Sequence, residues 1–173
     1  MHLLVDSTGL RLCGPGEWLA EKHGTKRRRA WRVLHLATDA DTGRILGLTA
    51  SDITLSVPKL FFGYAMGSNL FFPFSVGASA CLFPEKATAA CVFAAIARHR
   101  PTVLVNVPTM IQQMVSHPDA RAQDFASLRL STSAGEPLAL PLRQRWNETF
   151  GVELLDGLGT AEQWHIFISH RAG

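Results

Sequence analysis

The sequence predicts an α/β protein in which strand–helix units build a parallel sheet, preceded by a short antiparallel β-meander. Three observations support this fold class. Apolar, β-branched runs alternate with helical patterns from residue 53 onward, short alternating strands with Asp- and Gly-rich turns occupy residues 1–50, and the composition changes near Ser51. We therefore expect two parts of different origin, residues 1–50 and 52–173, with the joint between Thr49 and Thr54.

In the first part we expect a strand over residues 2–6, a turn over residues 7–9 and a new strand beginning at Leu10. Residues 31–38 alternate large with small or polar side chains, as a strand does. An Asp- and Gly-rich turn follows, and residues 44–48 are expected to return as a strand. Together these elements form the predicted antiparallel meander.

In the second part, strand and helix patterns alternate along the chain. Strands are expected over residues 80–83, 102–107, 128–132 and 152–155, and helices over residues 60–69, 88–99, 109–117 and 140–150. Thr88 is the expected N-cap of its helix, and Pro108 suits a first helical turn. Repeated strand–helix–strand units imply parallel strands with right-handed crossovers.

The uncharged stretch of residues 60–83 is long enough to cross a bilayer, and Gly63 and Gly67 have the spacing of packed membrane helices. However, the polar turn at residues 67–69, Pro73 and Gly77 interrupt it. We favour a short helix, a turn and a strand of an α/β core. The N-terminus reaches a charged residue too early for the apolar region of a signal peptide.

The charge is uneven along the chain. Residues 1–50 hold eight Lys or Arg against five Asp or Glu, whereas the remainder holds nine of each. Any attraction to nucleic acid is therefore expected in the first part. The three cysteines, an odd number at wide spacing, fit neither a disulfide framework nor a zinc site and favour a cytoplasmic protein.

A series of short motifs runs through the first part. They are Val5-Asp6-Ser7-Thr8-Gly9-Leu10, Gly16-Glu17-Trp18, Lys22-His23-Gly24, Trp31-Arg32 to His35, and Asp39-Ala40-Asp41-Thr42-Gly43. The series resembles the start of the catalytic domain of DDE-type insertion-sequence transposases, which has an RNase H-like fold. The resemblance implies that Asp6, at a strand end, is the first of three carboxylates that hold two divalent metals. Asp39 and Asp41 match the hairpin turn of that family.

The remaining two carboxylates of that family belong beyond residue 50, where the resemblance has ended. One carboxylate supplies too few oxygen ligands for two hard cations, so the alternative role of Asp6 is a turn residue at a strand end. The basic run Lys26-Arg27-Arg28-Arg29 suits contacts with DNA phosphates. A solvated loop is the alternative for this run, and a DNA-binding transposase remnant is the alternative function of the chain.

In the second part, Gly-bearing turns follow two successive strands, where ligands of parallel sheets bind. Four segments then resemble the adenylate-forming superfamily, in particular its benzoate-CoA ligase branch. The segments are Lys59 to Gly67, Pro101 to Thr109, Leu130 to Glu136, and Leu155 to Glu162 with Trp164-His165-Ile166-Phe167. The resemblance implies an ATP-dependent ligase that adenylates an aryl carboxylate and passes the acyl group to coenzyme A, with Mg²⁺ on the ATP.

The resemblance also implies the residues of each site. The ATP-binding residues are Gly135, Glu136, Pro137, Asp156, Gly157, Leu158, Gly159, Thr160 and Glu162, with Glu162 on the Mg²⁺. The aryl pocket is lined by Phe62, Gly63, Tyr64 and His165; taken alone, these aromatic residues and the histidine also fit an ordinary core. Ala161 stands where the family usually has Thr, so phosphate contact by a hydroxyl at that position is not expected.

Several features of the ligase family are not found in this sequence, among them the motif with the Asp that holds the ribose. The Ser/Thr/Gly-rich phosphate loop is expected before residue 52, where transposase-like sequence stands. The lysine used in adenylation belongs to a small C-terminal domain that the resemblance does not cover. Little preorganised charge then stabilises the pentavalent phosphate, so we expect a truncated ligase segment, fused behind a transposase fragment, without useful ligase activity.

Overall fold

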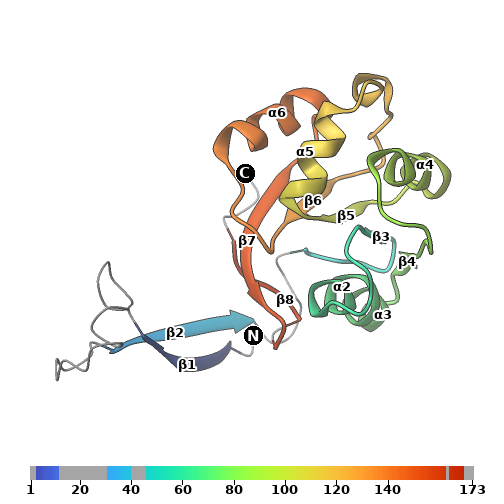
Figure 1. The fold of residues 1–173 in the computed structure, drawn as a ribbon. Helices are drawn as coiled ribbons and strands as arrows, with labels where there is room; N and C mark the ends of the chain where they lie inside the picture. The colour runs from blue at the N-terminus through green and yellow to red at the C-terminus, as the bar shows by residue number, and fades with distance from the viewer. Residues whose placement is uncertain (1–2, 12–30, 40–45, 163, 170–173) are drawn as a thin grey trace. The chain divides into compact units, whose positions relative to one another are not determined.

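The computed structural model describes residues 3–11, 31–39, 46–162 and 164–169 (Figure 1). The chain forms two compact units, Met1–Asp41 and Thr42–Gly173, which we describe separately. This division rests on contacts. The boundary expected from the sequence, between residues 50 and 52, concerns the origin of the two parts and stays a prediction.

The first unit contains an antiparallel pair of strands, β1 (Leu3–Arg11) and β2 (Trp31–Asp39), paired from Leu3↔Asp39 to Arg11↔Trp31. The antiparallel character is confirmed, but the turn expected at residues 7–9 is wrong. These residues stay extended because each one pairs with a residue of β2, as Gly9 does with Val33.

Asp6 consequently lies in the middle of β1, opposite Leu36, and the expected position at a strand end is wrong. The basic run of residues 26–29 and the turn residue Asp41 lie outside the described residues. Within the returning strand expected at residues 44–48, residues 46–48 are irregular, and Leu46 is buried in the second unit against Val103 and Leu155.

The second unit is built on a six-stranded sheet in the order β4-β3-β5-β6-β7-β8 (Figure 1). The strands are β3 (Ile53–Ser56), β4 (Ser79–Cys81), β5 (Val103–Asn106), β6 (Leu130–Ser133), β7 (Leu154–Thr160) and β8 (His165–Ser169). The neighbours from β4 to β7 are parallel, which confirms the predicted parallel sheet. The last pair, β7 with β8, is antiparallel.

Three helices, α4 (Ala89–His99), α5 (Pro108–Ser116) and α6 (Leu140–Phe150), confirm the three predicted in this region. The Thr88 hydroxyl caps α4 by accepting the N–H of Cys91 at 3.2 Å. A single 3₁₀ turn, Ala120–Ala122, follows α5. The apolar faces of these helices pack with the strand residues Leu55, Leu104 and Leu154 in one core.

A second helical segment packs against β3, β7 and β8. It runs through α2 (Gly63–Met66), the π-helical turn η1 (Gly67–Phe71) and α3 (Phe72–Ser75). The helix end expected at residues 67–69 is therefore wrong, because the segment continues through a π-turn. No helix in the described residues combines the length and apolar character needed to cross a bilayer.

Glycine explains the path of this segment. A Cβ atom at Gly67 would lie 2.0 Å from the carbonyl oxygen of Trp164, and one at Gly63 would lie 3.0 Å from that of Ala161. The two glycines thus let the helix backbone rest directly on the β7–β8 turn. Their spacing serves this contact within the second unit.

An ion pair at the amino ends of the strands fixes residues 46–52. The guanidinium of Arg129 donates to both carboxylate oxygens of Asp52, at 2.9 and 3.1 Å, and to the carbonyl oxygens of Leu46 and Gly47. The Thr102 hydroxyl donates to Asp52 at 2.6 Å. Burial alone would raise the pKa of Asp52, but these donors and the Arg129 charge outweigh it and hold the pKa below its usual range.

Candidate functional site

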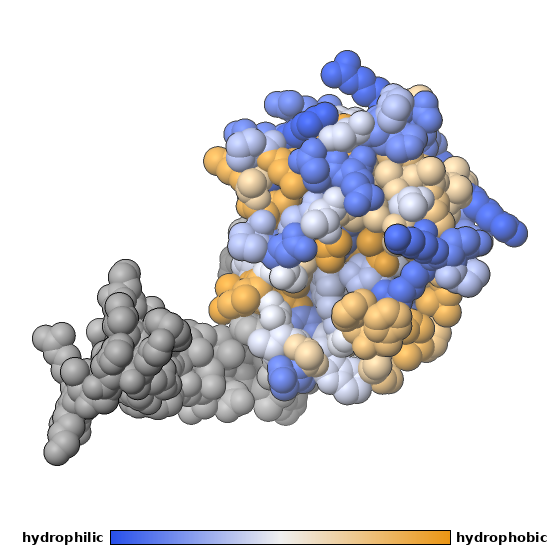
Figure 2. Space-filling model, viewed as in Figure 1, coloured by the Kyte–Doolittle hydropathy of each residue, from blue (hydrophilic) through white to orange (hydrophobic). Residues whose placement is uncertain are grey.

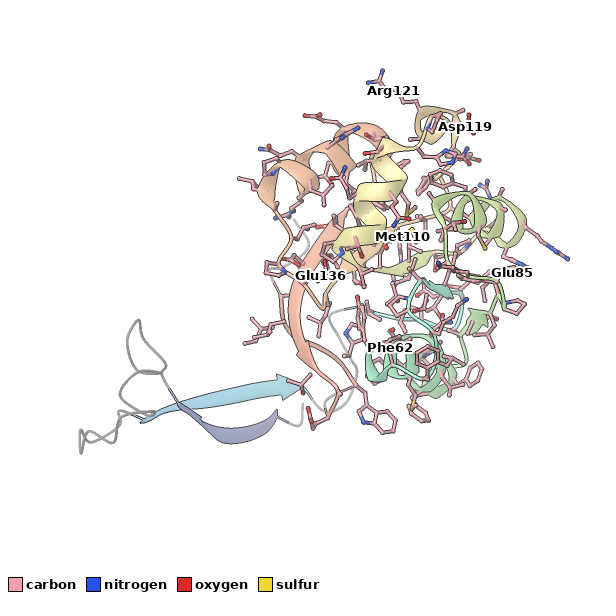
Figure 3. All side chains as sticks on the ribbon, in the orientation of Figure 1. Phe62, Glu85, Met110, Asp119, Arg121 and Glu136 are labelled. Carbon is pink, nitrogen blue, oxygen red and sulfur yellow. The ribbon has the colours of Figure 1, made fainter. Side chains whose placement is uncertain are left out.

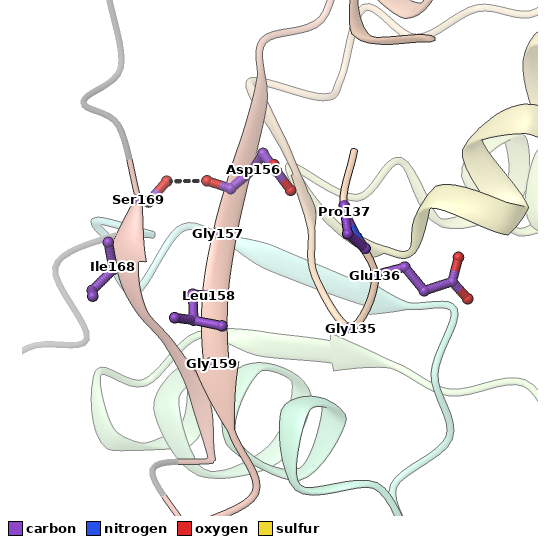
Figure 4. Close-up of a pocket in the computed structure, with 9 residues that line it drawn as sticks. All are labelled: Gly135, Glu136, Pro137, Asp156, Gly157, Leu158, Gly159, Ile168 and Ser169. Carbon is purple, nitrogen blue, oxygen red and sulfur yellow. Dashed lines mark hydrogen bonds between the residues drawn. The ribbon is translucent and has the colours of Figure 1, made fainter. Parts of the chain in front are cut away.

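A pocket of about 470 Å³ lies where the loop after β6 meets β7 and β8 (Figure 4). Seven of the nine residues expected at the ATP site line it: Gly135, Glu136, Pro137, Asp156, Gly157, Leu158 and Gly159. Ile168 and Ser169 of β8 complete the wall, and sequence reasoning missed both. The structure therefore brings most of this predicted group together in one place.

The local conformations of the pocket wall differ from one segment to the next. Gly135 has φ +91°, a left-handed conformation that favours glycine, so the loop can turn directly after β6. The carboxylate of Glu136 points away from β7, while Leu158 is 57% exposed on the pocket wall (Figure 4). The wall thus offers an exposed aliphatic side chain and a tight backbone turn to a planar ligand.

The Gly-bearing turn expected over residues 156–162 is wrong for most of its length. Residues 156–160 are the second half of β7, and the chain turns only after Thr160. A Cβ atom at Gly157 would lie 2.2 Å from Ile166 Cγ2, and one at Gly159 would lie 2.4 Å from the His165 carbonyl oxygen. These glycines let β8 lie close to β7, and the apolar run of residues 166–168 was the signal for β8.

Thr160 and Glu162 do not line this pocket, and both are exposed near the β7–β8 turn. Among the described residues, no group of three His, Cys, Asp or Glu side chains is placed to hold a metal ion. Glu162 on its own offers one carboxylate, whereas Mg²⁺ also takes water and phosphate oxygens when it binds a nucleotide. Its role as a Mg²⁺ ligand stays a prediction.

A second group of predicted residues meets where α2 packs against β7 and β8. The Tyr64 ring lies edge-on to the His165 ring at 5.4 Å, and the His165 ring stacks on Phe72 at 5.4 Å. The Tyr64 hydroxyl is hydrogen-bonded to the Thr132 hydroxyl at 2.5 Å. Tyr64 and His165 of the expected aryl pocket are thus neighbours, and Thr132 joins them.

Gly63 and Phe62, the other two residues expected at the aryl pocket, are placed differently. Gly63 packs against the backbone of Ala161, and Phe62 is 55% exposed with its ring 4.6 Å from that of Phe61. Figure 3 shows Phe62 beside α2, and Figure 2 shows apolar side chains gathered over α2 and α3. Further exposed aromatic residues of this surface are Phe71, Phe74 and Trp164.

His165 is a buried imidazole with one unpaired ring nitrogen. It is 5% exposed, its Nδ1 accepts the N–H of Ile166, and its Nε2 has no hydrogen-bond partner. Burial lowers the pKa of His165 to about 4, so the imidazole is neutral at physiological pH. With Nδ1 accepting, the proton lies on Nε2, which leaves one unused donor beside Tyr64.

This burial predicts that the folded protein loses stability in mild acid. In the unfolded chain His165 has its ordinary pKa near 6.5, so between about pH 6.5 and 4 the unfolded chain binds the extra proton. The stability is complete above about pH 6.5 and falls by up to about 3 kcal/mol as the pH drops to 4. Thermal unfolding at pH 7.5 and 4.5 measures this loss.

His165→Gln is the control for this prediction, because it removes the titrating group from the same buried position. The variant should lose less stability than the wild type between the two pH values. An equal loss in both proteins would contradict the assignment of the effect to His165.

The parallel sheet and the pocket beside β7 define an α/β protein with a candidate ligand site at the carboxyl ends of its strands. Sequence comparison identifies the family. A model of the AMP-binding enzyme family matches residues 29–172, and the chain belongs to this family. A model of the transposase DDE domain matches residues 1–52, as the resemblance of the first part predicted. The two matches overlap over residues 29–52.

The curated relatives of the chain include aryl-CoA ligases. It is 45% identical to the benzoate–CoA ligase of Thauera aromatica over 129 residues, which are 75% of this chain and 24% of that protein. It is 40% identical to the anthranilate–CoA ligase of Pseudomonas aeruginosa over 75% of this chain and 24% of that protein. The chain thus spans about a quarter of the length of these curated relatives.

Solved structures confirm the fold. The anthranilate CoA ligase AuaEII in complex with anthranoyl-AMP superimposes with a TM-score of 0.71 at 44% identity, over 73% of this chain and 25% of that one. A benzoate CoA ligase from Burkholderia xenovorans LB400 gives 0.71 at 40% identity, over 82% and 31% of the two chains. The predicted adenylate-forming fold and the benzoate-CoA ligase branch are confirmed.

Proposed function

We propose that the second unit is the adenylate- and aryl-acid-binding part of an ATP-dependent aryl-CoA ligase. The observation that carries this proposal is the pocket that gathers seven of the predicted nucleotide residues beside β7. Its close relatives are ligases for benzoate and anthranilate, which favours a monocyclic aromatic acid as the ligand.

The pocket is lined by residues of β7 and β8, while Tyr64 lies on α2 and His165 on β8, which both contact β7. The two groups have distinct tasks in this proposal. The Gly135–Pro137 loop and Leu158 would flank the adenine ring, since both line the pocket and Leu158 offers an exposed aliphatic side chain. Tyr64 and His165 would enclose the aryl ring, which suits an edge-to-face contact with aromatic neighbours. ATP, Mg²⁺ and coenzyme A are the partners of the intact family in this scheme.

We further propose that this polypeptide joins a ligase segment to a transposase fragment, and that it does not complete adenylation by itself. The match to two unrelated families along one chain supports the fusion. The transition state of adenylation needs preorganised positive charge, and among the residues lining the pocket none is Lys or Arg.

Cys81 and Cys91 are free thiols, which suits the cytoplasmic location that we propose.

The proposal predicts binding of the adenylate without turnover. Titration of the full chain with benzoyl-AMP should show saturable binding, and Leu158→Glu should weaken it about tenfold because a carboxylate then stands against the nucleotide. The matched control is Leu140→Glu, another exposed leucine, which lies at the start of α6 and does not line the pocket. Equal binding by both variants would exclude this pocket as the adenylate site.

Turnover is measured in the same preparation as pyrophosphate release from benzoate and ATP. The wild type should release no more pyrophosphate than Glu162→Ala does. Release clearly above that of the variant would contradict the proposed inactivity, while leaving the assignment of the pocket intact.

A further inference from the structure

The bond between Tyr64 and Thr132 joins two segments that are far apart in the sequence. Tyr64 lies in α2, and Thr132 lies in β6, 68 residues later and shortly before the loop of the nucleotide pocket. Thr132 is fully buried, and its hydroxyl oxygen lies 2.5 Å from the Tyr64 oxygen. The bond therefore connects Tyr64, a residue of the proposed aryl pocket, to β6, the strand that leads into the Gly135–Pro137 loop.

The bond also determines where the Tyr64 ring lies relative to His165. The His165 ring has no hydrogen bond at Nε2; besides the Ile166 N–H on Nδ1, it is held by stacking on Phe72 and by the edge of Tyr64. A displaced Tyr64 ring would remove one of these two ring contacts. The relative positions of Tyr64 and His165 in the proposed aryl pocket thus depend on Thr132, although Thr132 was not among the residues expected there.

The Tyr64 phenol is a neutral group under physiological conditions. Burial raises the pKa of Tyr64 well above its usual value, the bond with Thr132 lowers it in part, and the charge of Asp156 raises it further. A neutral phenol has one O–H to donate and can accept in turn. While it is paired with Thr132, it has less capacity for a polar substituent on a bound aromatic ring.

We propose that Thr132 is a positioning residue that engages the Tyr64 hydroxyl and thereby sets which ring substituents the aryl-acid site accepts. This inference rests on the proposed function for its statement about ligands, while its statement about Tyr64 stands on the structure alone. The wild type should favour an unsubstituted ring near Tyr64. Loss of the Thr132 hydroxyl should release the phenol to bind a ring hydroxyl.

The first readout needs no ligand. Tyr64 is the single tyrosine of the chain, so protein labelled with [ζ-¹³C]tyrosine gives one NMR signal. Thr132→Val removes the hydroxyl at nearly constant volume and should shift this signal. Thr132→Ser keeps the hydroxyl and should leave the signal close to that of the wild type. A signal that Thr132→Val does not move overturns the proposal.

The second readout is specificity, measured as the ratio of the Kd for 4-hydroxybenzoate to the Kd for benzoate. The ratio should fall about tenfold in Thr132→Val, since one new hydrogen bond becomes possible, and stay within about twofold in Thr132→Ser. The double variant Thr132→Val with Tyr64→Phe should return toward the wild-type ratio. An unchanged ratio in Thr132→Val overturns the specificity role.

The double variant also keeps the test informative if Thr132→Val does not fold. It removes both partners of the hydrogen bond and therefore leaves no buried hydroxyl unpaired. If Thr132→Val does not fold while the double variant does, the pairing of the two hydroxyls is supported. If the wild type binds neither acid, the proposed function fails, and the NMR signal alone decides the positioning role of Thr132.

Discussion

Gly67→Ala is expected to destabilise the second unit by about 3 kcal/mol, because the new methyl group has no space. A Cβ atom at this position would lie 2.0 Å from the carbonyl oxygen of Trp164 and 2.9 Å from its carbonyl carbon. Both are backbone atoms of the β7–β8 turn, so a side-chain rotation cannot relieve the overlap. Alanine favours helix over glycine by about 1 kcal/mol, and this gain offsets only part of the cost. Urea unfolding followed by circular dichroism measures the difference.

Gly63→Ala is the matched control, since Gly63 lies one turn earlier on the same helical segment. Its Cβ atom would lie 3.0 Å from the Ala161 carbonyl oxygen, a tight contact that a small backbone shift can accommodate. We expect a loss below about 1 kcal/mol there, because the gain in helix propensity offsets most of it. Equal effects at the two glycines would contradict the close contact of η1 with Trp164.

Arg129→Ala is the second substitution with a large expected effect, about 2 to 3 kcal/mol of lost stability. It would leave the nearly buried Asp52 carboxylate with the Thr102 hydroxyl and with the hydroxyl and backbone N–H of Thr49 as its remaining donors. It would also release the carbonyl oxygens of Leu46 and Gly47. We place the loss at the low end for a broken buried pair because the Arg129 side chain is 42% exposed and partly screened by solvent.

Arg98→Ala, at an exposed arginine on α4, is the control for this substitution and should change the stability by less than about 0.5 kcal/mol. The contribution of Asp52 also has a defined pH window. Its folded-state pKa is depressed, so its contribution is complete above about pH 4 and is lost only as the pH falls through the lower folded value. An Arg129→Ala effect that is absent at pH 7 would contradict the ion pair.

Local signals in the sequence were sufficient for the helices that cover one face of the sheet. Thr88 and Pro108 mark helix starts through chemistry that involves only nearby residues, and both predictions are confirmed. The β-branched run before Pro108 likewise predicted the buried strand β5. Nothing distant along the chain had to be known for these elements.

The errors arise where a distant segment decides the local structure. The Gly-rich residues 156–160 had the composition of a loop, yet they are strand because β8 pairs with them. Gly67 had the appearance of a helix end, yet it is the point where η1 rests on Trp164. In the first unit, residues 7–9 had turn composition but pair with β2. Gly67, Gly157 and Gly159 each allow a close backbone contact with a segment that the local sequence does not identify.

The candidate site shows the same division. The resemblance to the ligase family pointed to seven residues that line one pocket. Thr132 and the two β8 residues of the pocket wall were missed, since their contacts cross long stretches of sequence, such as the 68 residues between Tyr64 and Thr132. Residue type alone gives no sign of such a partner.

Calorimetric titration of the full chain with benzoyl-AMP tests the central claim most directly. We predict saturable binding to a single site, weakened by Leu158→Glu and unchanged by Leu140→Glu. Absence of binding by a chain that unfolds cooperatively would contradict the proposed adenylate site, because the pocket beside β7 would then be formed but unable to hold the adenylate.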